Sequence, residues 1–452
     1  MEEEISVPES FIELIKPVVG TELDLFIKEL HTEPTASIRI NPKKQFARDL
    51  ADPVPWAAEG RYLSERPSFT LDPSLHAGAY YVQESSSMFL EQAVRSSVDL
   101  SKPLRVLDLC AAPGGKSTHL LSLLTSEALL VSNEVIKSRA SILSENLQKW
   151  GYPNLVVTQN DPSDFSKLTG FFDLIVVDAP CSGEGLFRKD REALKHWSKE
   201  NVELCALRQQ RILFDVWPSL KTGGTLVYST CTYNQKEDEN VLNEFQRKHN
   251  IEFQRITHED GWGIEEYDDQ GVIGYRLLPH KVRGEGFFIS SFKKLEDQDS
   301  VNLKTKQTFE YASSGTISKI SNWLSDPGRY SFISLNDLII AVRHSHLREI
   351  EFLNSNLRLL NKGTALARDK HGKLVPEHAA ALSTIIDQSQ FQAIELTRED
   401  AIKYLQKEPF QMDSAQKGFV LMTYNQNGIG WINQLEKRFN NLYPANWRIR
   451  MR

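Results

Sequence analysis

The chain has 452 residues, of which 25% are charged and 40% are hydrophobic, as in ordinary soluble globular proteins. No apolar run approaches the ~20 residues of a membrane span, and the acidic start MEEEISVPES lacks an apolar signal region. We therefore expect a cytoplasmic protein that does not bind membranes. The net charge of −7 argues against overall affinity for nucleic acids, so such a role would need local basic patches. Four cysteines in a chain of this length predict free thiols rather than a disulfide framework.

Residues 1–95 precede the first strand of an expected central sheet. Apolar residues at helical spacing predict a helix over 11–30, interrupted by Pro17 and Gly20, and 36–39 predicts a short strand. A small α+β domain is expected here. Tyr80 and Tyr81, placed shortly before the sheet, could stack on a base or could pack between domains, and the sequence leaves both alternatives open.

From Leu104 onward, strand and helix patterns alternate, as in a doubly wound α/β sheet. Continuous runs of Leu, Val and Ile, such as DLIVVD, imply parallel strands that are buried on both faces. The predicted strands are 104–109, 128–133, 155–158, 173–177 and 225–228. The predicted helices are 116–124, 137–150 and 201–220.

The stretch VLDLCAAPGGKSTHLL, residues 106–121, combines a buried strand, a tight glycine turn and a helix start. Gly114 and Gly115 let a ligand lie against the main chain, and the helix amino terminus offers N–H donors to a carboxylate or phosphate. We predict a small-molecule site at the carboxyl end of this strand. A P-loop is excluded because Cys110 stands where its first glycine is needed, and the G-x-G-x-x-G fingerprint of NAD sites is absent.

Polar residues follow the other predicted strands, at the edge where parallel sheets bind ligands. Glu134 closes the second strand, where an acid in a nucleotide-binding fold bonds ribose hydroxyls. Asn160 and Asp161 close the third strand and could meet an adenine amino group. Each residue alone is more often a cap or turn residue, but polar ends on every strand indicate a binding site. The fourth and fifth strands end in DAPC (178–181) and STCTY (229–233).

Cys181 and Cys231 follow neighbouring strands, and Asp178 stands three residues before Cys181. A disulfide is disfavoured in a cytoplasmic chain. We expect no metal, because a structural zinc site needs four ligands and C-x-x-C spacing is absent. The third alternative is a thiolate nucleophile, whose pKa must be lowered from its usual ~8.5 by nearby positive charge or dipoles. The candidate charges are Lys116, Arg188 and Lys189.

Five segments together resemble the successive motifs of the Sun/Nop-type RNA (cytosine-5)-methyltransferases. They are LDLCAAPGGK, the acid at Glu134, QNDPSDF, VVDAPCSGEGLFRKD and GGTLVYSTCTYNQKEDENVL. The resemblance spans His76 to about Phe292 and includes RLLPHKVRGEGFFIS (276–290). Both a PC and a TC cysteine are present, which is typical of the RNA class rather than of the DNA enzymes. The resemblance implies a Rossmann-like class I methyltransferase domain over 96–295 that uses S-adenosyl-L-methionine.

The resemblance also implies the roles of individual residues in methylation of cytosine C5. Cys231 supplies the thiolate that adds to C6, Asp178 protonates N3, and Cys181 assists release of the product. Glu134 binds the ribose of the cofactor, Asp161 faces its adenine, and Asp178 also touches the cofactor pocket. The segment 183–189 is expected to be a mobile substrate loop, although a plain solvent loop is the alternative. The cofactor loop comprises Cys110, Ala111, Ala112, Pro113, Gly114, Gly115 and Lys116. Three further residues, His119, His196 and Cys205, are interpreted as structural.

The part of the chain after the sheet is expected to bind RNA. Following a polar linker over 295–303, we predict a mixed intermediate domain over 304–385, with strands over 331–335 and 338–342. We predict a β-rich domain over 390–452, with strands over 418–423 and 428–431 around a helix over 398–405. The stretch 437–452 has five basic residues, no acids and interleaved aromatics, which suits phosphate contact and base stacking. This pattern resembles the PUA-like domain of the RsmF-like branch of the family, whose substrate is a cytosine in small-subunit (16S) ribosomal RNA. A monomer is expected. Transfer RNA as the substrate, or a non-catalytic role in ribosome assembly, are the alternatives.

Overall fold

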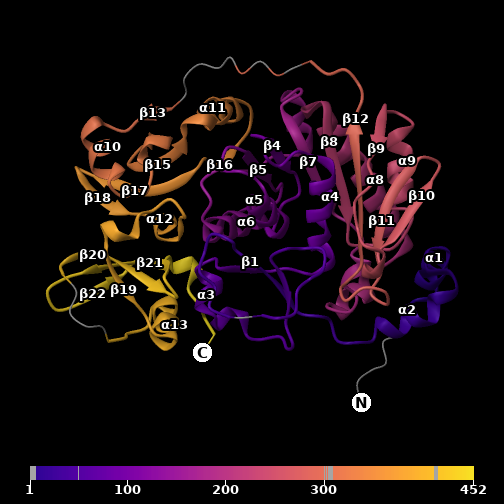
Figure 1. Ribbon diagram of the computed structural model, residues 1–452, viewed down its shortest axis with the longest axis horizontal. Coiled ribbons are helices and arrows are strands. Elements are labelled where there is room, and N and C mark those ends of the chain that lie inside the picture. Colours follow the sequence, from indigo (N-terminus) through magenta and orange to yellow (C-terminus); the bar gives the residue numbers. More distant parts are fainter. Residues whose placement is uncertain are drawn as a thin grey trace.

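The computed structural model describes residues 7–48, 50–299, 301, 303, 309–411 and 416–451. Figure 1 shows a large central sheet, with the amino-terminal strands below it and the two carboxyl-terminal sheets on the left. The stretch 295–303, expected as a linker, lies partly outside the described residues. Among the residues the structure does describe, no helix is both long and apolar enough to span a membrane.

The amino-terminal region is a small α+β unit, as predicted, with a three-stranded antiparallel sheet in the order β2-β1-β3. Pro17 lies inside α1 and does not interrupt it. The helical segment divides instead at Gly20, whose φ of 55° favours glycine. Tyr80 is buried and donates a hydrogen bond to Asp72, which favours its packing role. The elements are α1 (Glu9–Val19), α2 (Leu23–Glu29), β1 (Ser37–Ile40), β2 (Gly60–Tyr62), α3 (Pro73–His76), β3 (Tyr80–Val82) and α4 (Leu90–Ser97).

In the described residues, ten strands form the central mixed sheet, whose main path has the order β10-β11-β12-β8-β7-β4-β5-β6-β16, with β9 paired to β12. The five predicted strands are all present and all parallel, and their apolar side chains form cores on both faces of the sheet. These strands are β4 (Arg105–Asp108), β5 (Leu129–Asn133), β6 (Leu155–Thr158), β7 (Phe172–Asp178) and β8 (Leu220–Thr230). The antiparallel additions are β9 (Ile251–Phe253), β10 (Glu265–Asp269), β11 (Val272–Leu277), β12 (Phe287–Lys294) and β16 (Leu359–Asn361).

The helices that connect these strands lie close to their predicted positions. The helix predicted over 201–220 begins two residues earlier, because Ser198 caps it by accepting a hydrogen bond from Asn201 N. It ends at Val216, and the following turn contains Pro218. The connecting helices are α5 (Gly115–Leu123), α6 (Lys137–Trp150), α7 (Arg191–His196), α8 (Lys199–Val216) and α9 (Glu239–Gln246).

The carboxyl-terminal region contains two further sheets, with the orders β13-β14-β15-β17-β18 and β19-β20-β21-β22. Strands predicted over 331–335, 338–342, 418–423 and 428–431 and the helix predicted over 398–405 are all present. The first set comprises β13 (Glu310–Tyr311), α10 (Ser314–Ser321), β14 (Tyr330–Leu335), β15 (Leu338–Arg343), α11 (Leu347–Asn356), β17 (Thr364–Lys370), β18 (Lys373–Pro376) and α12 (His378–Leu382). The second comprises β19 (Gln392–Glu395), α13 (Arg398–Gln406), β20 (Gly418–Tyr424), β21 (Asn427–Gln434) and β22 (Phe439–Asn441).

One strand joins the carboxyl-terminal region to the central sheet. β16 pairs antiparallel with β6 and extends the sheet beyond its predicted edge. Asn160 stabilises this junction, because its side chain donates to Arg358 O (3.2 Å) and accepts from Arg358 N (3.0 Å). The expectation that Asn160 meets an adenine amino group is therefore wrong in this structure, since its amide and carbonyl are both used by the main chain of Arg358.

Candidate active site

The turn between β4 and α5 begins at a buried acid. Asp108 is fully buried at the end of β4 and accepts a 2.6 Å hydrogen bond from Ser117 Oγ of α5. Burial raises the pKa of Asp108 to about 7. Gly114 starts the helix with a φ of 117°, a conformation that side chains rarely adopt, so the predicted need for glycine is confirmed there.

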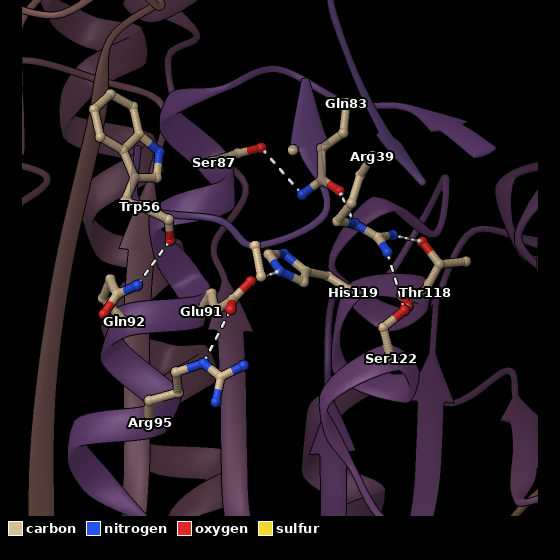
Figure 2. A network of polar contacts seen from close by, with 12 residues as sticks. Arg39, Trp56, Gln83, Ser87, Glu91, Gln92, Arg95, Thr118, His119 and Ser122 are labelled. Atoms are coloured by element: carbon tan, nitrogen blue, oxygen red, sulfur yellow. Dashed lines mark hydrogen bonds and ion pairs between the residues drawn. The ribbon is translucent and has the colours of Figure 1, made fainter. Parts of the chain in front are cut away.

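Helix α5 is joined to the amino-terminal region by two sets of buried polar contacts, one at Arg39 and one at His119, which Figure 2 shows together. Arg39 of β1 donates to Gln83 Oε1 (2.8 Å), to Thr118 Oγ1 (2.6 Å) and to Ser122 Oγ (3.1 Å). Its guanidinium also lies 4.6 Å from the ring centroid of Trp150. Thr118 in turn donates to Gly114 O (2.8 Å), so Arg39 contacts the glycine turn through one intermediate side chain.

His119 is the second support. It is buried on α5, and its Nε2 lies 3.0 Å from Glu91 Oε2 of α4 (Figure 2). Burial lowers the pKa of His119 to about 4, which keeps the ring neutral at physiological pH. The expected structural role of His119 is consistent with this placement.

The carboxyl ends of the parallel strands surround a cavity of about 650 Å³, a volume typical of sites for small molecules. Seven of the predicted site residues line it: Cys110, Ala112, Glu134, Asp161, Asp178, Cys181 and Cys231. The other five, Ala111, Pro113, Gly114, Gly115 and Lys116, form the turn and the helix start next to it and do not line the cavity.

Two acids stand on the side of the cavity formed by β5 and β6. Glu134 is 3% exposed and accepts a hydrogen bond from Ile136 N (3.0 Å), with Arg139 3.5 Å away. Asp161 caps the following turn by accepting from Ser163 N (3.1 Å), and its second oxygen lies 3.3 Å from Arg211 Nη2. Asp161 is therefore both a cap residue and part of the cavity wall, so the two alternatives considered for it are compatible.

Asp178 lies at the end of β7 and forms an ion pair with Lys116, the last residue of the predicted cofactor loop. Lys116 Nζ is 2.8 Å from its Oδ2, and Ser229 Oγ donates to its Oδ1 (2.9 Å). Both carboxylate oxygens are thus oriented by neighbours. This ion pair joins the first strand-to-helix turn to the segment that carries Cys181.

The two cysteines meet at the same cavity. Their Sγ atoms are 3.0 Å apart, too long for a disulfide, and both thiols are free. The hydrogen bond between Cys181 and Cys231, together with burial, raises the pKa of the Cys181 thiol well above its usual value, so Cys181 remains protonated.

Two of the three charges proposed for thiolate stabilisation are engaged elsewhere. Arg188 bonds to Glu285 (2.9 Å) and Glu29 (2.7 Å), and Lys189 lies 3.9 Å from Glu285. Lys116 pairs with Asp178. The expectation that Arg188 or Lys189 supplies a free charge to the cysteines is therefore wrong.

The expected mobile loop over 183–189 is fixed at two points. Glu184 is fully buried, and Arg188 makes the ion pairs just described. Leu186 between them is 41% exposed and lines the cavity. The segment thus forms part of the cavity wall, and its mobility stays a prediction.

Sequence analysis did not identify several residues that organise the site. Asn133 donates to Leu109 O (3.1 Å) and Asn160 O (3.0 Å), so it joins three strand ends. Arg39 was noted only as the end of a short strand. In the fold Arg39 contacts α5, and no pattern in the neighbouring sequence predicts this contact. Glu237 lies within the TCTYNQKEDEN segment, so the resemblance did include it without assigning it a function.

The sheet order and the site define the class of protein. The five parallel strands have the spatial order 3-2-1-4-5, counted along this domain, and the segment after the first strand lines the same cavity as an acid at the end of the second. This is the Rossmann-like fold of class I S-adenosylmethionine-dependent methyltransferases.

The comparisons with known proteins identify the family. A model described as 16S rRNA methyltransferase RsmB/F matches residues 98–293, the model of the RsmF amino-terminal domain matches 7–85, and that of the RsmF PUA domain matches 391–449. "Ribosomal RNA small subunit methyltransferase F" of Shewanella woodyi is 30% identical over an alignment of 446 positions, which covers 93% of this chain and 92% of that protein. The chain belongs to this RsmF family and is an S-adenosylmethionine-dependent methyltransferase.

Other relatives agree. The protein of the same name from Aliivibrio salmonicida is 28% identical and covers 98% of both chains. A crystal structure of a methyltransferase homologue from Pyrococcus horikoshii is 26% identical, with a TM-score of 0.55 over 64% of this chain and 96% of that one. NSun6 from the same organism, solved with SFG, shares the fold at 22% identity and a TM-score of 0.53 over 64% of this chain and 99% of that one.

Proposed function

We propose that this protein transfers a methyl group from S-adenosylmethionine to C5 of one cytosine in 16S ribosomal RNA through a covalent adduct with Cys231. The observation that carries the proposal is the meeting of Cys231, Cys181 and Asp178 at one cavity beside the cofactor turn. Each of the three has a function in the chemistry that cytosine requires.

C5 of cytosine is a poor nucleophile, so an addition at C6 must come first. The Cys231 thiolate forms a bond to C6, and Asp178, which must be in its protonated form when the base is bound, donates its proton to N3, which makes C5 electron-rich. Bound S-adenosylmethionine supplies the electrophilic methyl group. Afterwards the C5 proton is released to solvent, the C6–S bond breaks with its electron pair returning to Cys231, and the N3 proton returns to Asp178.

Cys181 is proposed to assist that last bond cleavage. Its thiol is 3.0 Å from Cys231 Sγ and is held protonated, so it can donate a hydrogen bond to the departing sulfur. A group that stabilises the leaving thiolate accelerates release of the product.

The cofactor is proposed to occupy the opposite side of the cavity. Glu134 would accept hydrogen bonds from the ribose hydroxyls, and Asp161 would face the adenine amino group, since both residues line the cavity wall formed by the ends of β5 and β6. Val135 and Ile136 supply an apolar surface there and are about half exposed. The turn from Cys110 to Lys116 would face the methionine part, with Asp178 at the edge of the same pocket.

The regions outside the catalytic domain are proposed to bind RNA. We assign residues 1–95 and 390–452 to RNA-binding domains, 96–295 to catalysis and 304–385 to an intermediate domain. The basic and aromatic stretch from residue 437 supports contact with phosphates and bases. A small ribosomal subunit as the partner, a monomeric protein and a cytoplasmic location complete the proposal.

The test is methyl transfer from labelled S-adenosylmethionine to 30S subunits, to naked 16S rRNA and to transfer RNA. The proposal predicts label in one cytosine of the ribosomal RNA, and its loss in Cys231→Ala. Label in transfer RNA alone would reassign the substrate. Label in no RNA would overturn the enzymatic proposal in favour of a non-catalytic assembly factor.

A further inference from the structure

Two buried carboxylates lie behind the cysteines and are joined by one amide. Glu184 and Glu237 are both fully buried. Asn234 Nδ2 donates to Oε1 of each carboxylate at 2.9 Å, so one side chain connects both acids. Asn234 also accepts from Glu237 N (3.0 Å), which orients its amide.

Each carboxylate reaches across to the segment of the other cysteine. Glu237, six residues after Cys231, accepts from Ser182 N (2.9 Å), the residue that follows Cys181. Glu184, three residues after Cys181, accepts from Tyr233 N (2.9 Å), two residues after Cys231. The two cysteine segments are therefore held by reciprocal bonds.

Further contacts fix the same two segments. Gln209 of α8 donates to Glu237 Oε2 (2.8 Å) and to Pro180 O (3.1 Å), and Gly185 N donates to Cys231 O (2.8 Å). A Cβ on Gly185 would lie only 2.8 Å from Cys231 O, so the main chains approach more closely than any other residue would permit. Both main-chain and side-chain contacts therefore hold the two cysteine segments close together.

The composition of this network points to positioning rather than to general stability. Burying two carboxylates costs several kcal/mol of desolvation each, and apolar residues of similar volume would usually give equal or greater stability. The network instead joins the two cysteine segments to each other, and Gln209 and Trp197 add bonds to Glu237 Oε2 (2.8 Å) and Glu184 Oε1 (3.0 Å), so it fixes a geometry. Glu184, Asn234 and Glu237 are not among the residues that line the cavity.

We propose that the bridge Glu184–Asn234–Glu237 is a positioning device that sets the separation of the Cys181 and Cys231 thiols. Its consequence for catalysis rests on the proposed function, because the two thiols act in succession on one base. The separation itself can be measured without any methyl transfer.

The experiment uses the full chain and the variants Glu237→Ala, Asn234→Ala and Glu237→Gln. Diamide oxidises two neighbouring thiols to a disulfide, and mass spectrometry of the Cys181–Cys231 peptide pair gives the rate. We expect that rate to fall about tenfold in both alanine variants, and only about twofold in Glu237→Gln, which keeps an acceptor for Ser182 N–H. In methylation assays, kcat should fall more in the two alanine variants than in Glu237→Gln, while KM for S-adenosylmethionine is unchanged.

The matched control is Asp72→Ala, which removes a buried carboxylate with three partners in the amino-terminal region. Its disulfide rate should equal that of the wild type. Equal rates in Glu237→Gln and in whichever alanine variants fold, judged by their circular dichroism, would overturn the proposal. If the wild type methylates no RNA, the proposed function fails, while the disulfide rates still decide on the bridge.

Discussion

Lys116 and Asp178 form the ion pair that joins the cofactor turn to the segment carrying Cys181. The 2.8 Å contact orients the carboxylate that is proposed to protonate N3. Ser229 holds the other oxygen. In this account, the charge of Lys116 acts through Asp178 and not directly on a thiol, which separates its function from that of a thiolate-stabilising cation.

Lys116→Met tests this assignment at the residue scale. Without the ammonium, Asp178 loses its orientation, and the proton transfer to N3 should slow by about 10²-fold in kcat, the usual contribution of a positioned acid. Single-turnover methylation at saturating cofactor measures this step. A variant whose only defect is a raised KM for S-adenosylmethionine would show that Lys116 binds the cofactor instead.

At the scale of elements, β1 of the amino-terminal sheet supports α5 of the catalytic domain through Arg39. The guanidinium is completely buried, and its hydrogen-bond partners among the described residues are neutral groups (Figure 2). Burial lowers the pKa of Arg39 to about 9. A buried charge of this kind is retained at a cost, which indicates that the geometry of the glycine turn depends on it.

Arg39→Met should therefore destabilise the fold and loosen the cofactor turn together. The substitution removes the hydrogen bonds that Gln83 Oε1 and Thr118 Oγ1 accept from Arg39, at an expected cost of about 3 kcal/mol in the free energy of unfolding. Urea unfolding measures that cost, and calorimetric titration should show weaker binding of S-adenosylmethionine. Thr118→Val, which removes the link to Gly114 O, should weaken binding as well. Unchanged affinity in both variants would contradict the connection.

The sequence predicts the positions of strands and turns better than it predicts contacts between distant segments. The parallel strands and the glycine turn follow from local runs of apolar residues and from Gly114, because both signals lie within a few residues. The pairing of β16 with β6 spans some 200 positions and depends on main-chain bonds to Asn160, which no local pattern reveals. Arg188 was likewise expected beside a thiolate, whereas its partners Glu29 and Glu285 come from distant segments.

At the scale of the whole molecule, buried titratable groups make stability depend on pH in two opposite ways. Burial lowers the pKa values of His76 and His119 to about 4 and raises those of Asp108 and Glu184 to about 7. Between pH 4 and 6.5 the unfolded histidines bind protons that the folded ones do not, so they make stability fall as pH falls. The carboxyls bind more protons in the folded state, so they make stability fall as pH rises toward 7.

His119→Gln separates the two effects. From pH 7 to pH 5, wild-type His119 should reduce the free energy of unfolding by about 2 kcal/mol, and the variant should lack this part of the loss. Urea unfolding at the two pH values measures the difference. An identical pH dependence in both proteins would mean that the buried ring already carries a proton at pH 7.

The covalent adduct between Cys231 and the target cytosine is the central claim, and Cys181→Ala tests it most directly. If Cys181 assists release, this variant should retain labelled ribosomal RNA as a slow band on a denaturing gel, and peptide mapping should place the nucleotide on Cys231. Cys231→Ala should give no such band. An active Cys231→Ala enzyme, or a nucleotide attached to any other residue, would contradict the account.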